Sequence, residues 1–132
     1  MITSVKQFTF DAAHFLPNYD GPCRNLHGHT YKLVVGFSGA LNLKTGMVVD
    51  FSKIKELLTP LISKLDHSFL NVMAIEDFPV DNPTAENMVS FLIQYIKDIL
   101  ERESKLGSIP VGIHLNFIQL WETPTSYAEW RN

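Results

Sequence analysis

Two histidines separated by a single glycine follow the only cysteine of the chain, in the stretch PCRNLHGHTYKLVVGF at residues 22–37. In an extended chain, residues two apart point to the same face, so His27 and His29 can direct both imidazoles at one point. Gly28 carries no side chain that would block a ligand or a neighbouring backbone. This arrangement suits two ligands of one zinc ion, although an HxH pair on a strand is also found without metal.

A third imidazole can join this pair if the strand before it lies beside the strand that it opens. His14 follows a stretch rich in β-branched and aromatic residues, which predicts a strand. Three imidazoles would leave one position of tetrahedral zinc open, which is typical of a catalytic site. The alternative is that these are ordinary surface or core histidines, and His114 is better interpreted in that way.

Cys23 is the only thiol in the chain, which excludes an intrachain disulfide and a structural zinc site built from cysteines. Pro22, Arg24 and Asn25 place it in a loop. Arg24 and a nearby zinc ion would favour the thiolate, which can act as a general base or a nucleophile. An inert buried thiol is the alternative.

Asp66 and His67 stand at the end of a predicted helix and allow two interpretations. The first is a solvated helix end, where a histidine complements the helix dipole. The second is a Cys-His-Asp proton-transfer set, assembled with Cys23 from distant parts of the chain. The residues alone favour the first.

Two further residues suit a small planar ligand. Glu122 ends the last predicted strand, where it is either exposed or accepts two hydrogen bonds from a ring that presents an amino group beside an N–H. Pterins and guanines present that edge. Thr84 and the neighbouring backbone N–H groups open a predicted helix and can face the same ligand.

The elements that must position these residues follow from hydrophobic periodicity. A period of two predicts strands over residues 4–14, 29–39 and 111–123, and MVVDF at 47–51 is a candidate short strand. In the last of these strands one parity holds Val111, Ile113, Leu115, Phe117 and Trp121, and the other holds His114 and Glu122.

A helical period replaces the period of two from Phe51 onward. It predicts a helix over 51–65 with Asp50 as N-cap and a bend at Pro60, which lies on the polar side. A second helix is predicted within 82–104, with Pro83 in its first turn and Asn82 or Thr84 as cap. Its buried stripe would consist of Met88, Leu92, Tyr95, Ile96 and Ile99. Two helices on one face of an antiparallel sheet, an α+β fold, is the simplest arrangement.

The 132 residues suit a single domain over 1–132, and the net charge of −3 argues against a broad electrostatic contact with nucleic acid. No apolar run approaches the roughly 18 residues that would span a bilayer. The first ten residues lack the pattern of a signal peptide, so we expect a cytoplasmic protein with no membrane partner.

Six segments together resemble the 6-pyruvoyltetrahydropterin synthase-like family, in the order seen in that family. They are FDAAHFL, CRNLHGHTYKL, VVDFSKIK, LDHSFLN, NPTAENM and WET, and they extend over nearly the whole chain. The Cys-x-x-x-His-Gly-His spacing is similar to that of a bacterial and archaeal branch that forms 6-carboxytetrahydropterin in the queuosine pathway. The animal-type enzymes have a longer spacer.

The resemblance implies a role for each candidate residue. His14, His27 and His29 would hold Zn²⁺, Cys23 would be the catalytic base, and Asp66 and His67 would complete the proton relay. Glu122 would anchor the pterin ring, and Thr84 and Glu86 would line its pocket. Lys6, Arg24 and Lys44 are unranked candidates for binding the triphosphate.

The resemblance also implies the tunnelling fold, in which a four-stranded antiparallel sheet carries two helices on one face. Three such units would form a barrel and two barrels a homohexamer, with active sites between subunits. The implied reaction converts 7,8-dihydroneopterin triphosphate to 6-carboxy-5,6,7,8-tetrahydropterin, acetaldehyde and triphosphate. A pyruvoyl-type synthase, a non-catalytic zinc-containing pterin-binding module and a small zinc-stabilised structural protein are the alternatives.

Overall fold

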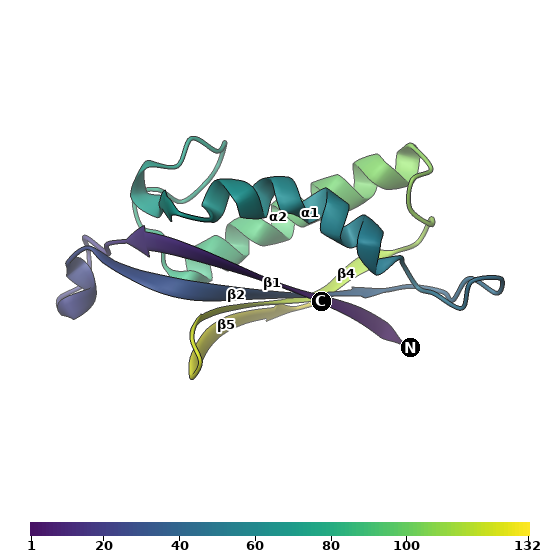
Figure 1. Cartoon of the computed structure of the whole chain (residues 1–132), viewed down its shortest axis with the longest axis horizontal. Helices are drawn as coiled ribbons and strands as arrows, with labels where there is room; N and C mark the ends of the chain where they lie inside the picture. The colour runs from purple at the N-terminus through teal and green to yellow at the C-terminus, as the bar shows by residue number, and fades with distance from the viewer.

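Two long strands, joined by a loop that carries Cys23, form the centre of the protein in a computed structural model that describes all residues 1–132. Five strands form one mixed sheet in the order β3-β1-β2-β4-β5, and both helices cover the same face of it (Figure 1). The strands are β1 Thr3–His14, β2 His27–Ser38, β3 Ser68–Phe69, β4 His114–Thr123 and β5 Ser126–Arg131. The helices are α1 Phe51–Leu65 and α2 Ala85–Lys105, with short 3-10 turns η1 Pro22–Arg24 and η2 Leu70–Val72.

The β1–β2 pairing confirms the two strands that the sequence predicted first. The strands run antiparallel over their whole length, and the register sets His14 opposite His27 and Ala12 opposite His29. Because side chains alternate between the faces of a strand, both histidines of β2 lie on the face that also holds Tyr31. Tyr31 is fully buried, so this is the face beneath the helices.

The expected four-stranded antiparallel sheet is present as β1, β2, β4 and β5, but it is not the whole sheet. The two-residue β3 adds to the outer edge of β1 in the parallel direction, which makes the sheet mixed. β5 lies in the tail to which the sequence pattern assigned no element, and it pairs antiparallel with β4. The candidate strand at 47–51 is wrong, because Val48 and Val49 enter the core from an irregular segment that leads into α1.

The predicted parity of the last strand is correct at Leu115 and wrong beyond it. The β2–β4 register shifts between Gly36 and Phe37, so that Phe37 pairs with Leu115 and Gly36 with Phe117. The extra residue on β4 reverses which side chains face the helices. Ile118 and Leu120 are therefore buried, while Phe117 and Trp121 are only partly buried.

The helices confirm the helical periods, with small differences at the second N-terminus. Asp50 caps α1 by accepting a hydrogen bond from the N–H of Ser52 at 2.8 Å. Thr84 caps α2, so Pro83 precedes the cap instead of lying in the first turn. The stripe of α2 is buried as predicted except at Tyr95, which is half-buried.

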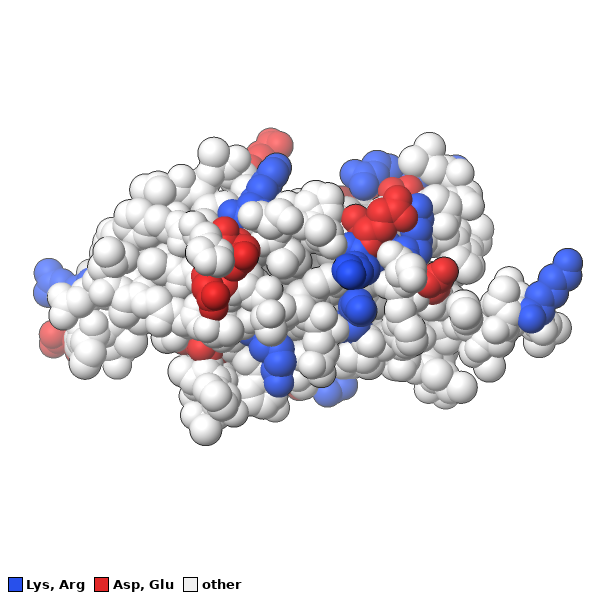
Figure 2. All heavy atoms as spheres, in the orientation of Figure 1, with Lys and Arg blue, Asp and Glu red and all other residues white.

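Charged side chains are spread over the molecule. Figure 2 shows acidic and basic groups interspersed on one face, without a continuous area of one sign. A net charge of −3 is consistent with this view. Neither helix combines the length and the apolar character that crossing a membrane requires.

Candidate metal centre

Three imidazole rings meet where β1 ends and β2 begins, on the helix-covered face of the sheet. The ring centres of His14, His27 and His29 lie 4.6–5.1 Å from one another. One ring nitrogen from each lies within 4.8 Å of the other two. The cross-strand register explains the cluster, because it sets His14 opposite His27 and brings His29 to the same face.

Backbone carbonyls determine which nitrogen each ring presents. His14 donates from Nδ1 to the carbonyl of Pro83 at 2.8 Å, and His27 donates from Nδ1 to that of Asn25 at 2.8 Å. A carbonyl can only accept, so in the neutral rings both Nε2 atoms carry lone pairs. These two Nε2 atoms lie 3.1 Å apart, and two lone pairs at that distance repel each other unless a cation lies between them.

The surroundings of His29 also indicate a cation site. Its Nε2 is buried and has no hydrogen-bond partner, which is costly for a polar atom unless a ligand satisfies it. Burial, with smaller contributions from His14 and His27, lowers the pKa of His29 to about 4, so the ring is neutral at pH 7. Nitrogen ligands at about 2.0–2.1 Å around tetrahedral zinc lie about 3.3 Å apart, close to the observed separation. The three residues therefore fit a metal ion.

Tyr31 packs against the histidine cluster, and the sequence pattern did not single it out. Its hydroxyl lies 3.3 Å from Nδ1 of His14, and its ring stacks on Phe10 at 4.9 Å. Burial raises the pKa of Tyr31, with a further contribution from the charge of Glu122. The alternation of the strand could have identified Tyr31, because it shares the parity of His27 and His29.

Glu122 lies beside the histidines. Its Oε2 is 4.0 Å from Nε2 of His29, and the hollow next to it has a volume of about 440 Å³, with Lys32 and Trp121 also in its wall. Burial raises the pKa of Glu122, and the nearby Glu86 carboxylate raises it further, while His27 lowers it. The charge of Glu86 thus acts on Glu122 from the first turn of α2.

Thr84 stands at the same end of the molecule but is engaged with its own helix. Its hydroxyl accepts a hydrogen bond from the N–H of Asn87 at 3.1 Å. The preceding carbonyl, that of Pro83, holds His14. The start of α2 thus contacts the metal centre through its backbone.

Cys23 lies in η1, in the loop that links the two histidine-bearing strands, and is partly exposed. Its carbonyl accepts from the N–H of Leu16 at 2.9 Å, which closes the loop. The thiol does not belong to the group of ligand atoms formed by the three histidines. The structure therefore brings the loop to the metal centre and leaves the sulfur outside the ligand set.

Asp66 and His67 form a pair, but not with the histidine cluster. Asp66 accepts from the ring of His67 at 3.0 Å and from the backbone N–H of Asp11 at 2.8 Å. The N–H of Asp11 and the ring of His67 lower the pKa of Asp66. Both side chains gather at the carboxylate of Asp11, whose neighbours Phe10 and Ala12 point into the core. Asp11 therefore faces the uncovered side of the sheet, opposite to the three histidines.

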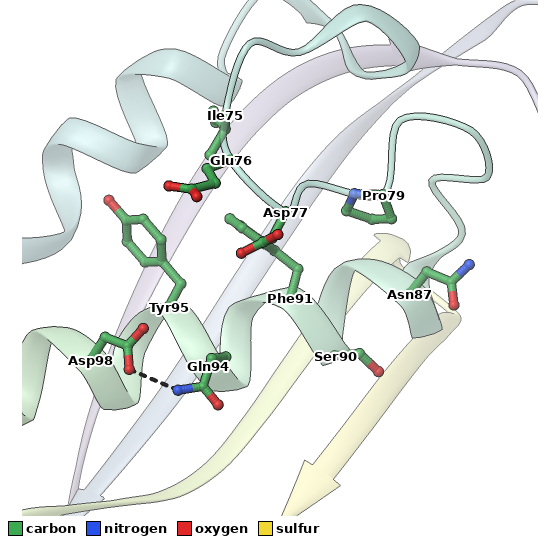
Figure 3. Close-up of a pocket in the computed structure, with 10 residues that line it drawn as sticks. All are labelled: Ile75, Glu76, Asp77, Pro79, Asn87, Ser90, Phe91, Gln94, Tyr95 and Asp98. Carbon is green, nitrogen blue, oxygen red and sulfur yellow. Dashed lines mark hydrogen bonds between the residues drawn. The ribbon is translucent and has the colours of Figure 1, made fainter.

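A larger hollow than the one beside Glu122 lies elsewhere. Figure 3 shows it between α2 and the loop before it, with Phe91, Tyr95 and Asp98 on the helix side. Its volume is about 660 Å³, and none of the predicted site residues lines it. The candidate metal centre is therefore identified by its chemistry and not by the size of a cavity.

Comparison with known proteins agrees with the geometry. The 6-pyruvoyl tetrahydropterin synthase family model matches residues 3–132. The chain is 36% identical to the 6-carboxy-5,6,7,8-tetrahydropterin synthase of Haemophilus influenzae, over 99% of both chains. It is 32% identical to the dihydroneopterin monophosphate aldolase of Pyrococcus furiosus, over 89% of this chain and 87% of that one.

A solved structure gives the same result for the fold. The structure of 6-pyruvoyl tetrahydropterin synthase from Caenorhabditis elegans superposes with a TM-score of 0.80 at 25% identity, covering 99% of this chain and 95% of that one. The likeness extends over both helices and the whole sheet, so it includes the elements that bring the three histidines together. With the family match over almost every residue, it follows that the chain belongs to the 6-pyruvoyl tetrahydropterin synthase family of enzymes.

Proposed function

We propose that the protein is a zinc-dependent lyase that converts 7,8-dihydroneopterin triphosphate to 6-carboxy-5,6,7,8-tetrahydropterin, acetaldehyde and triphosphate. The observation that carries the proposal is the position of Glu122, 4.0 Å from the unpartnered nitrogen of His29. Glu122, the proposed acceptor for the pterin ring, thus lies next to the histidines that would hold the zinc ion as a Lewis acid. The 36% identity to a 6-carboxy-5,6,7,8-tetrahydropterin synthase favours this product over others.

The roles of the residues follow from their chemistry. Glu122 accepts two hydrogen bonds from the amino and N–H edge of the ring, which fixes the ring and directs its side chain toward the three histidines. Cys23, as thiolate, takes a proton from a carbon of that side chain. His67 returns a proton, and Asp66 holds the His67 ring in place and stabilises its charged form. No redox cofactor is required.

His14, His27 and His29 would hold the zinc ion through Nε2. Bound there, zinc supplies Lewis-acid activation of the hydroxyl groups on the substrate side chain. The fit rests on the facing lone pairs of His14 and His27 and on the unpartnered nitrogen of His29.

The proposed relay needs a second copy of the chain. Asp66 and His67 lie against Asp11 on the uncovered side of the sheet, away from the histidines beneath the helices. If His67 acts on the same substrate as Cys23, it comes from a neighbouring copy. We propose that this neighbour belongs to a barrel of three copies within a hexamer in the cytoplasm, with active sites shared between subunits. The sheet edge at β5 and the part of β1 that β3 leaves unpaired are open for pairing between copies.

The decisive experiment is incubation of the zinc-loaded protein with 7,8-dihydroneopterin triphosphate, with every product identified by mass spectrometry. We expect 6-carboxy-5,6,7,8-tetrahydropterin and acetaldehyde. A pyruvoyl product would replace the proposal by the pyruvoyl-type reaction, because the two pterins differ in mass. Tight binding without turnover would leave only a pterin-binding module.

A second candidate, an aldolase acting on dihydroneopterin monophosphate, is favoured by the 32% identity to the Pyrococcus furiosus enzyme. The two candidates differ in the phosphate chain that the enzyme accepts. A parallel incubation with the monophosphate separates them. Cleavage of the monophosphate with no reaction of the triphosphate would support the aldolase and reject the lyase proposed above.

A further inference from the structure

The contact between His14 and Pro83 joins the metal centre to the start of α2. His14 is completely buried, and its Nδ1–H donates to the Pro83 carbonyl at 2.8 Å across 69 residues of sequence. The Tyr31 hydroxyl lies further from the same nitrogen, at 3.3 Å. The carbonyl is therefore the group that keeps hydrogen on Nδ1 and the lone pair on Nε2.

The Pro83 carbonyl lies outside the hydrogen-bond pattern of the helix and is free for His14. Pro83 precedes the N-cap Thr84, and the first N–H groups of a helix have no acceptor within it. The N–H of Asn87 is one of these groups, and it bonds to the hydroxyl of Thr84 at 3.1 Å. The first regular bond of the helix runs from Met88 to the carbonyl of Thr84, at 2.9 Å.

The turn before the helix is held from two directions. The carbonyl of Asn82 accepts from the N–H of Thr84 and from the side-chain amide of Asn87, each at 2.9 Å. Thr84 has an extended backbone, with φ −69° and ψ 159°. These contacts turn the chain at Pro83, so that its carbonyl points away from the helix axis toward His14.

We propose that Thr84 is a positioning residue for the metal centre. By accepting from the N–H of Asn87, its hydroxyl holds the turn that directs the Pro83 carbonyl at His14, and so it selects the tautomer that presents Nε2 to the metal. This inference rests on the proposed metal site, and it gives Thr84 a role that operates before any substrate binds. Thr84 would thus cap the helix and, through Pro83, also orient a metal ligand.

The test compares three variants. Thr84→Ala removes the hydroxyl, Thr84→Ser keeps it, and Asp50→Ala removes the equivalent cap of α1, where Asp50 accepts from Ser52. The Asp50 variant loses a similar cap far from His14 in sequence and contact. The tautomer of His14 is measured in the metal-free protein by ¹⁵N NMR of the imidazole, and zinc affinity by competition with a chelator.

We expect Thr84→Ala to shift His14 away from the pure Nδ1–H form and to weaken zinc binding about 10-fold or more, the usual effect of losing a group that orients a ligand. Thr84→Ser should restore both, and Asp50→Ala should change neither. The inference is overturned if Thr84→Ala keeps the wild-type tautomer and affinity, or if Asp50→Ala weakens zinc binding equally. Because neither measurement uses substrate, failure here is distinguishable from failure of the proposed reaction.

Discussion

At the scale of single residues, binding the metal and moving protons are assigned to different side chains. The three histidines form the candidate ligand group, while the Cys23 thiol lies outside it in a partly exposed loop. A base that is not a ligand can be removed without releasing the metal. The two roles can therefore be tested one at a time.

Cys23→Ala should retain wild-type zinc content and lose activity. Removal of a general base typically costs about 10²- to 10⁴-fold in rate, so we expect a loss of turnover of that order. Zinc is measured by elemental analysis and turnover by product formation. Full activity in this variant would remove Cys23 from the mechanism.

His27→Ala should instead lose zinc. Its Nε2 lies 3.1 Å from that of His14, so its removal leaves too few nitrogen ligands for tight binding. His114→Ala is the matched control, because His114 lies at the start of β4 and outside the cluster. Unchanged zinc content in His27→Ala, after dialysis against a chelator, would reject the ligand assignment.

Asp66 should make the stability of the protein depend on pH in acid. Because the N–H of Asp11 and the ring of His67 lower its pKa below the usual 3.8, the unfolded chain binds more protons than the folded one as pH falls. The stabilisation is therefore present above about pH 4 and is lost as pH falls through the folded-state pKa. Asp66→Asn should be less stable than wild type at pH 7, with a gap that narrows below pH 4.

Urea denaturation from pH 7 to pH 2.5 measures this gap. Asp20→Asn is the control, because that exposed carboxylate makes no hydrogen bond or ion pair. A difference between Asp66→Asn and wild type that stays constant over the whole range would contradict the linkage.

At the scale of elements, long periodic segments were predictable and short or interrupted ones were not. The strand that ends at His14 and the helix over 51–65 carry patterns long enough to be unambiguous, and both are present. β5 has only six residues and was missed, whereas the valines of 47–51 resemble a strand but fill the core from an irregular segment. The bulge in β4 reverses which side chains of the strand face the helices, and its position could not be predicted from the sequence.

A close contact beside that bulge can be tested by mutation. A Cβ placed on Gly36 would lie 2.2 Å from the ring of Phe117, which covers the glycine on the neighbouring strand. Gly36→Ala should therefore destabilise the protein by about 1–3 kcal/mol through overpacking. The free energy of unfolding is measured by chemical denaturation.

A double-mutant cycle identifies the cause of that loss. In a Phe117→Ala background the same glycine substitution should cost much less, because the ring that it meets is gone. Equal costs in both backgrounds would assign the destabilisation to the backbone of β2 and not to the contact.

At the scale of the whole molecule, the sequence predicted the residues of the candidate site but not where all of them lie. The HxH pair could be placed on one face from parity alone, and the third histidine followed once the strands were paired. The Pro83 carbonyl could not be predicted, because it is a backbone group that reaches His14 across 69 residues. Nor could the sequence show that His67 lies on the other side of the sheet.

The separation of His67 from the histidine cluster predicts complementation between inactive variants. If each site takes Cys23 from one copy and His67 from another, oligomers that mix Cys23→Ala and His67→Ala chains contain some sites with both groups intact. Random mixing at equal amounts gives about a quarter of all sites. Co-expressed chains with different tags, purified through both tags, should therefore recover activity that neither variant has alone.

The matched control mixes Cys23→Ala with His27→Ala. The Cys23 loop and His27 belong to one copy, since His27 donates to the carbonyl of Asn25 in that loop. Each intact site needs both residues from the same chain, and no mixed oligomer supplies them, so this pair should stay inactive. Mixed oligomers of the first pair that form but remain inactive would mean that His67 does not act across the interface, and the shared-site assembly would then lose its chemical basis.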